Sequence, residues 1–358
     1  MELKPPSASD PILIWGGGAI GGTIAAYWAR AGIPVLLVDI VQAHVEACRT
    51  TGLRIEGPVD QFTQVVPAVT PSELRGVYSR IVLAVKAQNT AAVMTDLLPH
   101  LAADGFVLSA QNGLNEITIA EHAGADRTIG CYIGFASDWL GPGQVLYGGR
   151  AEVVIGEIEG SSRPRTADMH RLMQIFEPEA VLTENIWGYL WSKLCLASML
   201  FATALNNDDM PSNFADPKRF PVFDRLAREV MSVACARHVT TQPFRNFEPM
   251  AFAPGSDESV SRAAVAQLAL RWRNSAKKHS GFWRDMAVRK RRTEVDPMLG
   301  PVADFGRQAG LDMPALCTLI GLVHDIEDGR REQSWDTFQV LLDECVRQRG
   351  LDPGSTSQ

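Results

Sequence analysis

The sequence predicts an α/β fold: a doubly wound, mostly parallel sheet followed by an all-helical second domain. Residues 11–40 have the pattern of a strand, a glycine-rich turn, a helix and a second strand. Short apolar runs then recur up to residue 157, whereas from about Glu184 the apolar segments are as long as helices. We therefore expect a first domain over residues 1–183, a helical domain over 184–346 and a disordered tail over 347–358.

The first element is a β-α-β unit, with predicted strands at 12–15 and 35–38. Gly16, Gly18 and Gly21 between them have the G-x-G-x-x-G spacing. These glycines allow a tight turn, close approach of the backbone to a pyrophosphate, and close packing of helix on strand. The helix N-terminus adds N–H groups and a positive dipole end. This context favours a Rossmann dinucleotide site over a chance glycine-rich turn. The predicted cofactor-binding residues of the turn are Gly16, Gly17, Gly18, Ala19, Ile20 and Gly21.

Asp39 ends the second predicted strand, about 20 residues after the glycine turn. A carboxylate at this place can accept hydrogen bonds from the adenosine ribose hydroxyls, and it repels a ribose 2′-phosphate. The neighbours Ile40 and Val41 offer no positive charge to receive such a phosphate. The sequence therefore favours NAD(H) over NADP(H) as the cofactor.

Polar residues follow two further apolar strands, predicted at 79–84 and 105–110. Lys86 comes directly after the first of these strands, and Asn112 follows the second. Ligands of open parallel sheets bind beyond the carboxyl ends of the strands, so both residues are predicted to face the cofactor. The alternatives are a solvated loop lysine and an ordinary Asn-Gly turn.

The other elements of the first domain are predicted from shorter patterns. We expect a strand over 61–69, helices over 90–101 and 161–173, and antiparallel strands over 130–157 that finish the sheet.

The second domain begins with an apolar helix over 186–205, in which Lys193 is the one ammonium group. A lysine in such a helix is costly unless it is paired or functional; the alternative is a side chain that snorkels at the helix edge. Further helices are predicted over 221–238, 260–278 and 315–326, and a long loop or lid over 241–261.

The composition indicates a water-soluble protein with a sizeable core. The formal charge of −7 argues against general binding to nucleic acid or anionic membranes, and we interpret the basic run Arg289–Arg292 as a solvated face, which could also support an anionic substrate. The six cysteines form no C-x-x-C pair, which indicates reduced, mostly buried thiols. We see no metal-ligand cluster, signal peptide or 18-residue apolar run, and expect a cytoplasmic location.

Taken together, the motifs resemble the ketopantoate reductase (2-dehydropantoate 2-reductase) family over nearly the whole chain. The residues that carry the resemblance are GGGAIGG at 16–22, VKAQNT at 85–90, QNG at 111–113, WSKL at 191–194, Glu229, HSGFWRDMAVRKRRTEVD at 279–296 and the following Gly-Leu-Asp-Met-Pro loop. The resemblance implies a Rossmann domain, an all-helical domain, and an active site in the cleft between them. It also implies an NAD(P)-dependent oxidoreductase.

Residue roles follow from the resemblance. Lys193 resembles the family's catalytic lysine, and Glu294 the carboxylate that anchors the substrate. Lys86 and Asn112 resemble residues of the cofactor and substrate cleft, and Ser280 a substrate contact. In such a reaction, hydride moves between the nicotinamide and the carbonyl carbon of a 2-oxo acid. Negative charge develops on the oxygen, which a nearby ammonium stabilises and protonates.

Two departures from the family pattern concern the substrate and the cofactor. The family usually has asparagines four and eight residues after the catalytic lysine, where this chain has Ala197 and Phe201. The pocket wall should then be more apolar, which puts ketopantoate itself in doubt. Asp39 takes the place of a residue tolerant of NADP.

Three functions remain open at this point: reduction of ketopantoate or a relative, NAD-linked catabolic oxidation of a more apolar hydroxy compound, and a non-catalytic dinucleotide sensor. The expected partner is a small carboxylate substrate, and a homodimer is considered.

Overall fold

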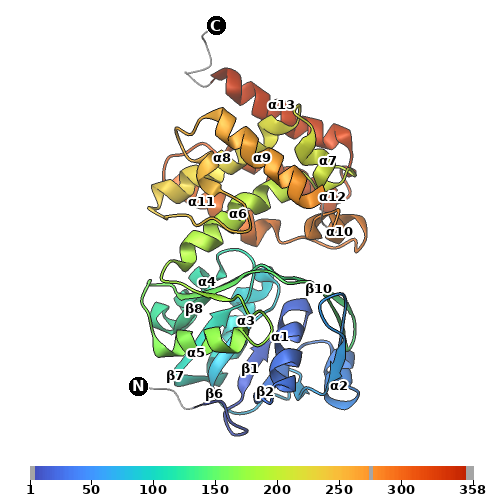
Figure 1. The fold of residues 1–358 in the computed structure, drawn as a ribbon, viewed down its shortest axis with the longest axis vertical. Coiled ribbons are helices and arrows are strands. Elements are labelled where there is room, and N and C mark those ends of the chain that lie inside the picture. The colour runs from blue at the N-terminus through green and yellow to red at the C-terminus, as the bar shows by residue number, and fades with distance from the viewer. Residues whose placement is uncertain (1–4, 274–276, 352–358) are drawn as a thin grey trace. The chain divides into compact units, whose positions relative to one another are not determined.

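The computed structural model describes residues 5–273 and 277–351, with side chains up to residue 347. The chain divides into two units, Met1–Ile186 and Trp187–Gln358, where the sequence placed the division after residue 183 (Figure 1). The first unit is α/β and the second is helical.

The first unit begins with the β-α-β unit that the glycine pattern predicts. Its elements in chain order are β1 (Ile12–Trp15), α1 (Ala19–Arg30), β2 (Val35–Val38), α2 (Gln42–Thr50), β3 (Leu53–Glu56), β4 (Phe62–Gln64), β5 (Ala68–Val69), β6 (Tyr78–Leu83), η1 (Ala87–Asn89), α3 (Thr90–Leu97), η2 (Leu98–His100), β7 (Leu101–Ser109), α4 (Asn115–Ala123), η3 (Ala125–Arg127), β8 (Thr128–Ile133), β9 (Ala136–Gly141), β10 (Gln144–Gly149), β11 (Val153–Glu157), α5 (Pro164–Met173) and β12 (Val181–Leu182).

The main sheet has the strand order β12-β11-β8-β7-β6-β1-β2-β5. In this spatial order, all neighbouring strands between β8 and β5 pair in parallel, whereas β11 pairs antiparallel with β8. The chain runs outward from β1 through β2 to β5 and then returns to β6 on the other side of β1. This reversal makes the carboxyl ends of β1 and β6 a topological switch point, the usual ligand position in such sheets.

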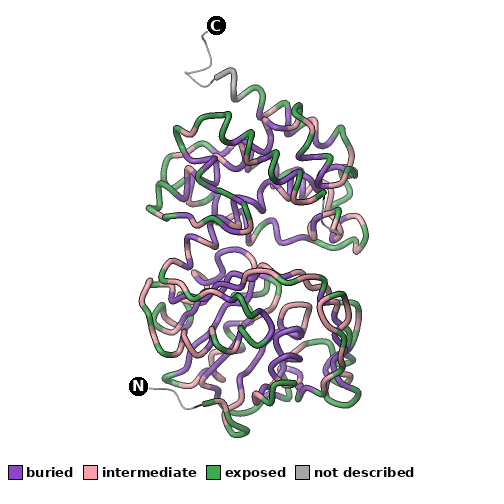
Figure 2. The backbone as a smooth tube through the Cα atoms, viewed as in Figure 1, coloured by how far each residue is buried: buried purple, intermediate pink, exposed green. Residues whose placement is uncertain are grey.

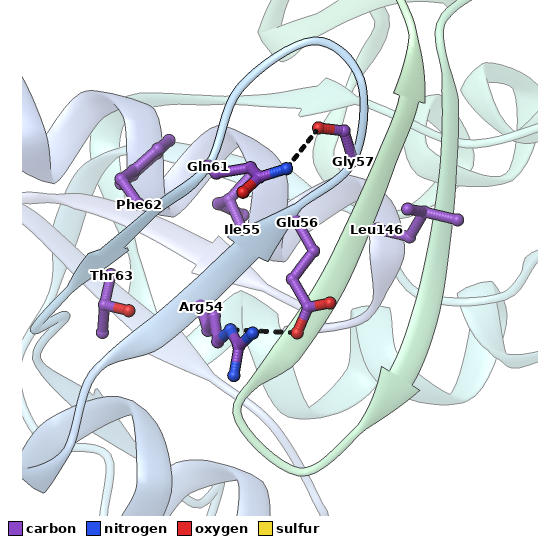
Figure 3. Close-up of a pocket in the computed structure, with 8 residues that line it drawn as sticks. All are labelled: Arg54, Ile55, Glu56, Gly57, Gln61, Phe62, Thr63 and Leu146. Atoms are coloured by element: carbon purple, nitrogen blue, oxygen red, sulfur yellow. Dashed lines mark hydrogen bonds and ion pairs between the residues drawn. The ribbon is translucent and has the colours of Figure 1, made fainter.

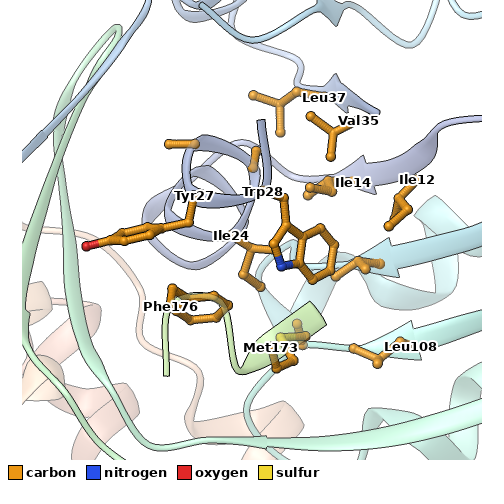
Figure 4. Packing of buried hydrophobic residues seen from close by; sticks show 14 of the residues in the cluster. Ile12, Ile14, Ile24, Tyr27, Trp28, Val35, Leu37, Leu108, Met173 and Phe176 are labelled. Atoms are coloured by element: carbon orange, nitrogen blue, oxygen red, sulfur yellow. The ribbon is translucent and has the colours of Figure 1, made fainter. Parts of the chain in front are cut away.

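Both faces of the main sheet are covered by helices, and its strands lie in the buried interior (Figure 2). Ile12 and Ile14 of β1 join a core cluster with residues of α1 and α5 (Figure 4). The alternate residues Leu13 and Trp15 join a second cluster with residues of α3 and α4. Successive strand residues face opposite sides, so β1 must be apolar throughout.

A second sheet, with the order β4-β3-β10-β9, corrects two expectations. We expected residues 61–69 to form one strand, but β4 joins this second sheet and β5 joins the main sheet. Pro67 stands between them and lacks the N–H that a continuous strand would need. We also expected residues 130–157 to finish the main sheet, but only β8 and β11 do so, because β10 pairs in parallel with β3.

The second unit is built from helices. They are α6 (Ile186–Ala202), which starts at the last residue of the first unit, α7 (Met210–Ala215), α8 (Phe220–Ala236), η4 (Pro249–Phe252), α9 (Glu258–Arg273), α10 (Gly281–Ala287), α11 (Val295–Gln308), α12 (Pro314–Glu327) and α13 (Trp335–Leu351).

The segment over 241–261, expected to be a long loop or lid, is a loop with one 3-10 turn up to the start of α9, and its three phenylalanines are buried. Phe244, Phe247 and Phe252 are at most 5% exposed, and the rings of Phe247 and Phe252 stack with centroids 6.0 Å apart. These phenylalanines therefore belong to the core of the helical unit, whereas Met250 and Val260 are exposed.

Three helix ends also differ from expectation. α3 ends at Leu97, and Pro99 lies in the short 3-10 turn that follows it. α9 ends at Arg273; of the rest of its expected range, 274–276 lie outside the described residues, and Lys277 and Lys278 are not helical. α13 continues to Leu351, although a tail was expected from residue 347. Residues 352–358 lie outside the described part.

All six cysteines lie in the described ranges, none of them forms a disulfide there, and four of the six are buried, as predicted. Of the helices within 5–273 and 277–351, none combines the length and the hydrophobicity that crossing a membrane requires.

Candidate functional site

The glycine turn lies between β1 and α1, at the switch point of the main sheet. Gly16 has a φ of +105°, and a Cβ there would stand 2.8 Å from the backbone of Ala84. A Cβ on Gly21 would stand 2.0 Å from the Gly16 carbonyl oxygen. By contrast, a Cβ on Gly18 would meet nothing within 4 Å. The fold itself requires the first and third glycines, whereas Gly18 leaves open space at the N-terminus of α1, as a bound diphosphate would need.

Asp39 lies beside this turn, after the end of β2. One oxygen of its carboxylate, Oδ2, accepts a hydrogen bond from the Gly17 N–H at 2.7 Å, and Oδ1 accepts one from the Val41 N–H at 2.8 Å. These amides fix the plane of a half-exposed carboxylate and leave lone pairs for other donors. Ile40, the next residue, is 80% exposed and offers an apolar surface beside the carboxylate.

His44 is a buried residue of the same region that the sequence reasoning missed. The ring accepts a hydrogen bond from the Gly143 N–H through Nδ1 at 2.9 Å, so in the neutral ring Nε2 carries the proton. Nε2 faces the turn, because a Cβ on Gly17 would stand 2.9 Å from it. Burial lowers the pKa of His44, against the opposing influence of Asp39 and the Gly17 backbone. The neutral His44 ring therefore packs against Gly17 of the glycine turn and joins it to Gly143.

The loops after β6 and β7 hold Lys86 and Asn112. Lys86 is exposed and Asn112 is half-buried. The two loops are joined by a buried network of side chains that the sequence reasoning also missed. Its members are Thr90, Gln111 and Asn115, each at most 6% exposed. The only sequence signal for them was a cluster of polar residues directly after apolar strands.

Three predicted site residues of the second unit, Lys193, Ala197 and Phe201, lie on α6 at intervals of four residues, and so on one helical face. Lys193 is half-buried, whereas Ala197 and Phe201 are buried. The Phe201 ring stacks on Phe282 with centroids 3.6 Å apart and an interplanar angle of 11°. Phe282 therefore shields Phe201, and contact of Phe201 with a ligand stays a prediction.

Ser280 and Glu294 both occupy helix N-caps in the second unit. Ser280 precedes α10, and its hydroxyl accepts a hydrogen bond from the Trp283 N–H at 3.1 Å. Glu294 precedes α11, and its side chain is buried, with the residue 4% exposed. The stacking of Phe201 on Phe282 brings α6 to the helix that Ser280 caps.

The basic run before Glu294 is held by ion pairs within the second unit. Arg289 and Arg291 both contact the buried carboxylate of Asp285, at 2.8 Å. Arg292 pairs with Asp328 at 2.5 Å, and Glu327 accepts hydrogen bonds from the Thr293 N–H and hydroxyl at 2.7 Å. Three of the four residues of the run are exposed, as a solvated face requires, and these ion pairs hold the segment that leads to Glu294.

Glu229, singled out by the resemblance, binds the N-terminus of α12. Its carboxylate accepts hydrogen bonds from the N–H groups of Ala315 at 3.1 Å and Leu316 at 2.8 Å, and from Arg225 at 3.1 Å. Burial raises the pKa of Glu229, and these three donors counteract that effect. The residue therefore joins α8 to α12.

Replacing Glu229 with alanine should lower the free energy of unfolding by about 2–4 kcal/mol, since two buried N–H groups and an arginine lose their acceptor. Urea unfolding at pH 7, followed by tryptophan fluorescence, measures the change. Glu258→Ala is the control, because the ion pair of Glu258 with Arg262 is exposed and is worth less than about 1 kcal/mol. Equal effects of the two substitutions would contradict this role.

A hollow lies on the second sheet of the first unit (Figure 3). It is lined by Arg54, Ile55, Glu56, Gly57, Gln61, Phe62, Thr63 and Leu146. Arg54 pairs with Glu56 at 3.0 Å, and Gln61 donates to the Gly57 carbonyl at 3.4 Å. None of the predicted site residues lines the hollow. Within the described ranges, no group of three or more His, Cys, Asp or Glu residues could hold a metal ion.

Comparison with known proteins gives matches over both units. Residues 12–160 match the family described as "Ketopantoate reductase PanE/ApbA", and residues 185–327 match its C-terminal counterpart. A 2-dehydropantoate 2-reductase of Halobacterium salinarum is 27% identical over 317 residues, covering 87% of this chain and 97% of that protein. One from Mesorhizobium japonicum is 24% identical, covering 87% and 96%.

Solved structures share the fold. A PanE/ApbA family ketopantoate reductase from Ralstonia eutropha is 26% identical, with a TM-score of 0.74, covering 89% of this chain and 99% of that one. D-mandelate dehydrogenase, solved with NADH and anilino(oxo)acetate, has a TM-score of 0.75 at 20% identity, with the same coverage.

Proposed function

This chain belongs to the ketopantoate reductase family, and from that premise we propose that it reduces a small 2-oxo acid with a nicotinamide cofactor. The observation that carries the proposal is the glycine turn at the switch point of the main sheet, with open space at Gly18 and a fixed carboxylate beside it. Ketopantoate reduction would place the enzyme in pantothenate biosynthesis.

The residues of the turn fit a dinucleotide. Gly18 and the N-terminus of α1 would receive the diphosphate, and Asp39 the adenosine ribose. The exposed side chain of Ile40 would lie beside the adenine. Lys86 and Asn112, which follow the neighbouring strands, would face the nicotinamide half. We propose NADH as the preferred form, because Asp39 disfavours a 2′-phosphate.

When bound, the reduced cofactor supplies the hydride. Lys193 would stabilise the charge that develops on the carbonyl oxygen and donate the proton to it. Glu294 would hold the substrate through a hydrogen bond to a hydroxyl, and Ser280 would contribute a further contact.

The substrate should be a small carboxylate, and one observation favours a second candidate. The side chains of Ala197 and Phe201, which share a face of α6 with Lys193, have no hydrogen-bonding groups. Phe282 adds an aromatic ring that stacks on Phe201. If the substrate reaches this face, a more apolar 2-hydroxy acid, oxidised with NAD in the catabolic direction, would suit it. We further propose a cytoplasmic location and consider a homodimer.

Steady-state assays should test NADH and NADPH against ketopantoate and a panel of 2-oxo acids with aliphatic or aromatic side chains. Turnover with NADH on any of them supports the proposal, and the best substrate separates the two candidates. Tight NADH binding without turnover across the panel would instead identify a dinucleotide sensor. Lys193 and Glu294 argue against a sensor, which has no need of a proton donor.

Replacing Asp39 with asparagine should lower the ratio of kcat/KM for NADH to that for NADPH by about 10-fold, because the charge that repels a 2′-phosphate is lost. The amide oxygen can still accept one of the backbone hydrogen bonds that the carboxylate makes. Asp96→Asn, on the exposed side of α3, is the matched control and should leave the ratio unchanged. An unchanged ratio in Asp39→Asn would remove Asp39 from cofactor selection.

A further inference from the structure

The side chain of Thr90, the first residue of α3, links the loops that follow β6 and β7. Its hydroxyl accepts a hydrogen bond from Nε2 of Gln111 at 2.8 Å and donates one to Oδ1 of Asn115 at 2.9 Å. Asn115 in turn donates to the Asn112 carbonyl oxygen, and Gln111 donates to the Val85 carbonyl oxygen at 2.9 Å.

The donor and the acceptor of each hydrogen bond in this network are fixed. The Val85 carbonyl can only accept, so the Gln111 amide must present Nε2 to it and to Thr90. The single hydroxyl proton of Thr90 is then left for Asn115. Every member is nearly out of solvent: Thr90 is 2% exposed, Gln111 5% and Asn115 6%. A buried network in which only one assignment of donors and acceptors is possible holds the backbone groups that it binds, the carbonyls of Val85 and Asn112, in one arrangement.

These backbone attachments adjoin the predicted ligand residues. Val85 directly precedes Lys86, and Asn115 bonds the main chain of Asn112 itself. Both loops follow strands β6 and β7, which are neighbours in the main sheet. The network therefore sets the distance between the backbone that carries Lys86 and the backbone that carries Asn112.

One atom of the network points to a ligand. Within the described residues, Oε1 of Gln111 is buried and has no hydrogen-bond partner. Its position is forced, because Nε2 is committed to Val85 and Thr90. A buried amide oxygen normally has a donor, so a bound molecule with a hydroxyl or amide N–H could supply one.

Resting on the proposed function, we propose that Thr90, Gln111 and Asn115 are positioning residues for the cofactor: they lock the two loops for the nicotinamide half of the dinucleotide, and Gln111 Oε1 accepts a hydrogen bond from it. The expected donors on that half are a ribose hydroxyl or the carboxamide N–H. None of the three residues takes part in the chemistry.

The test compares Thr90→Val with Thr90→Ser. Valine has the same shape without the hydroxyl, whereas serine keeps both hydrogen bonds. NADH affinity is measured by fluorescence titration, and thermal stability is measured without ligand. We expect Thr90→Val to raise the Kd for NADH about 10-fold and Thr90→Ser to remain within about 3-fold of the parent. Thr95→Val, an exposed position on the same helix, should leave the Kd unchanged.

A merely structural role would lower the melting temperature of Thr90→Val and leave the Kd of the folded protein unmoved, which would overturn the proposal. Equal losses in the serine and valine variants would also overturn it, since the hydroxyl would then be irrelevant. If Thr90→Val does not fold, Asn115→Leu breaks the same network one bond later and should show the same rise in Kd; an unchanged Kd would contradict the proposal. Failure of the parent and Thr95→Val to bind NADH would instead defeat the proposed function.

Discussion

Replacing Lys193 with alanine is expected to lower kcat by about 10²–10⁴-fold, the usual contribution of a positioned general acid. The proposal gives this ammonium two tasks, to stabilise charge on the carbonyl oxygen and to deliver a proton. Alanine can do neither, and water in the vacated space would be a weaker and less ordered donor. Steady-state kinetics with saturating NADH and the best 2-oxo acid of the panel measures the loss.

The affinity of the Lys193→Ala variant for NADH distinguishes a chemical role of Lys193 from a structural one. NADH affinity in Lys193→Ala should stay within about 3-fold of the parent, because the predicted dinucleotide residues all belong to the first unit. Lys218→Ala removes an exposed lysine of the second unit and should leave kcat unchanged. A Lys193 variant of nearly normal rate would exclude the lysine from the mechanism.

The second large effect is expected at Gly18. Replacing it with valine should raise the Kd for NADH by about 100-fold or more, because the side chain would fill the space proposed for the diphosphate. The substitution should cost little stability: a Cβ there meets nothing within 4 Å, and the backbone is extended at φ −65°, ψ −155°. Titration with NADH and thermal unfolding without ligand measure the two quantities.

Gly321→Val provides the matched comparison. Gly321 lies on the exposed side of α12, and a Cβ there also meets nothing within 4 Å. Both variants should therefore fold, and only Gly18→Val should lose NADH. Normal NADH affinity in Gly18→Val would show that the diphosphate does not approach this glycine.

Several features of the fold could be predicted because they depend on short stretches of chain. The glycine spacing and the strands on either side predicted the first β-α-β unit, since turn, strand and helix preferences act over a few residues. The polar residues that end β6 and β7 directed attention to Lys86 and Asn112 in the same way. The resemblance supplied the proposed roles of Lys193 and Glu294, which local patterns alone could not.

Other features could not be predicted, because the residues that form them are distant from one another in the sequence. The hairpin of β9 and β10 joins β3, about 90 residues earlier in the chain, and so forms a second sheet. The ion pairs of Arg292 reach Glu327 and Asp328, so the basic run, which is exposed as expected, is also anchored to the C-terminal end of α12. Hydrophobic periodicity carries no information about such pairings.

By itself, the sequence determined the first β-α-β unit, the change from short strands to long helices near residue 184, the position of the glycine turn and the acid that follows it. Only the tertiary structure decided that Gly17 donates to Asp39, that His44 supports the turn, and that Thr90 joins two loops through Gln111 and Asn115. The physical reason is that a strand or a turn is favoured by its own residues, whereas a buried polar group is stable only where the fold brings its partner within hydrogen-bond distance.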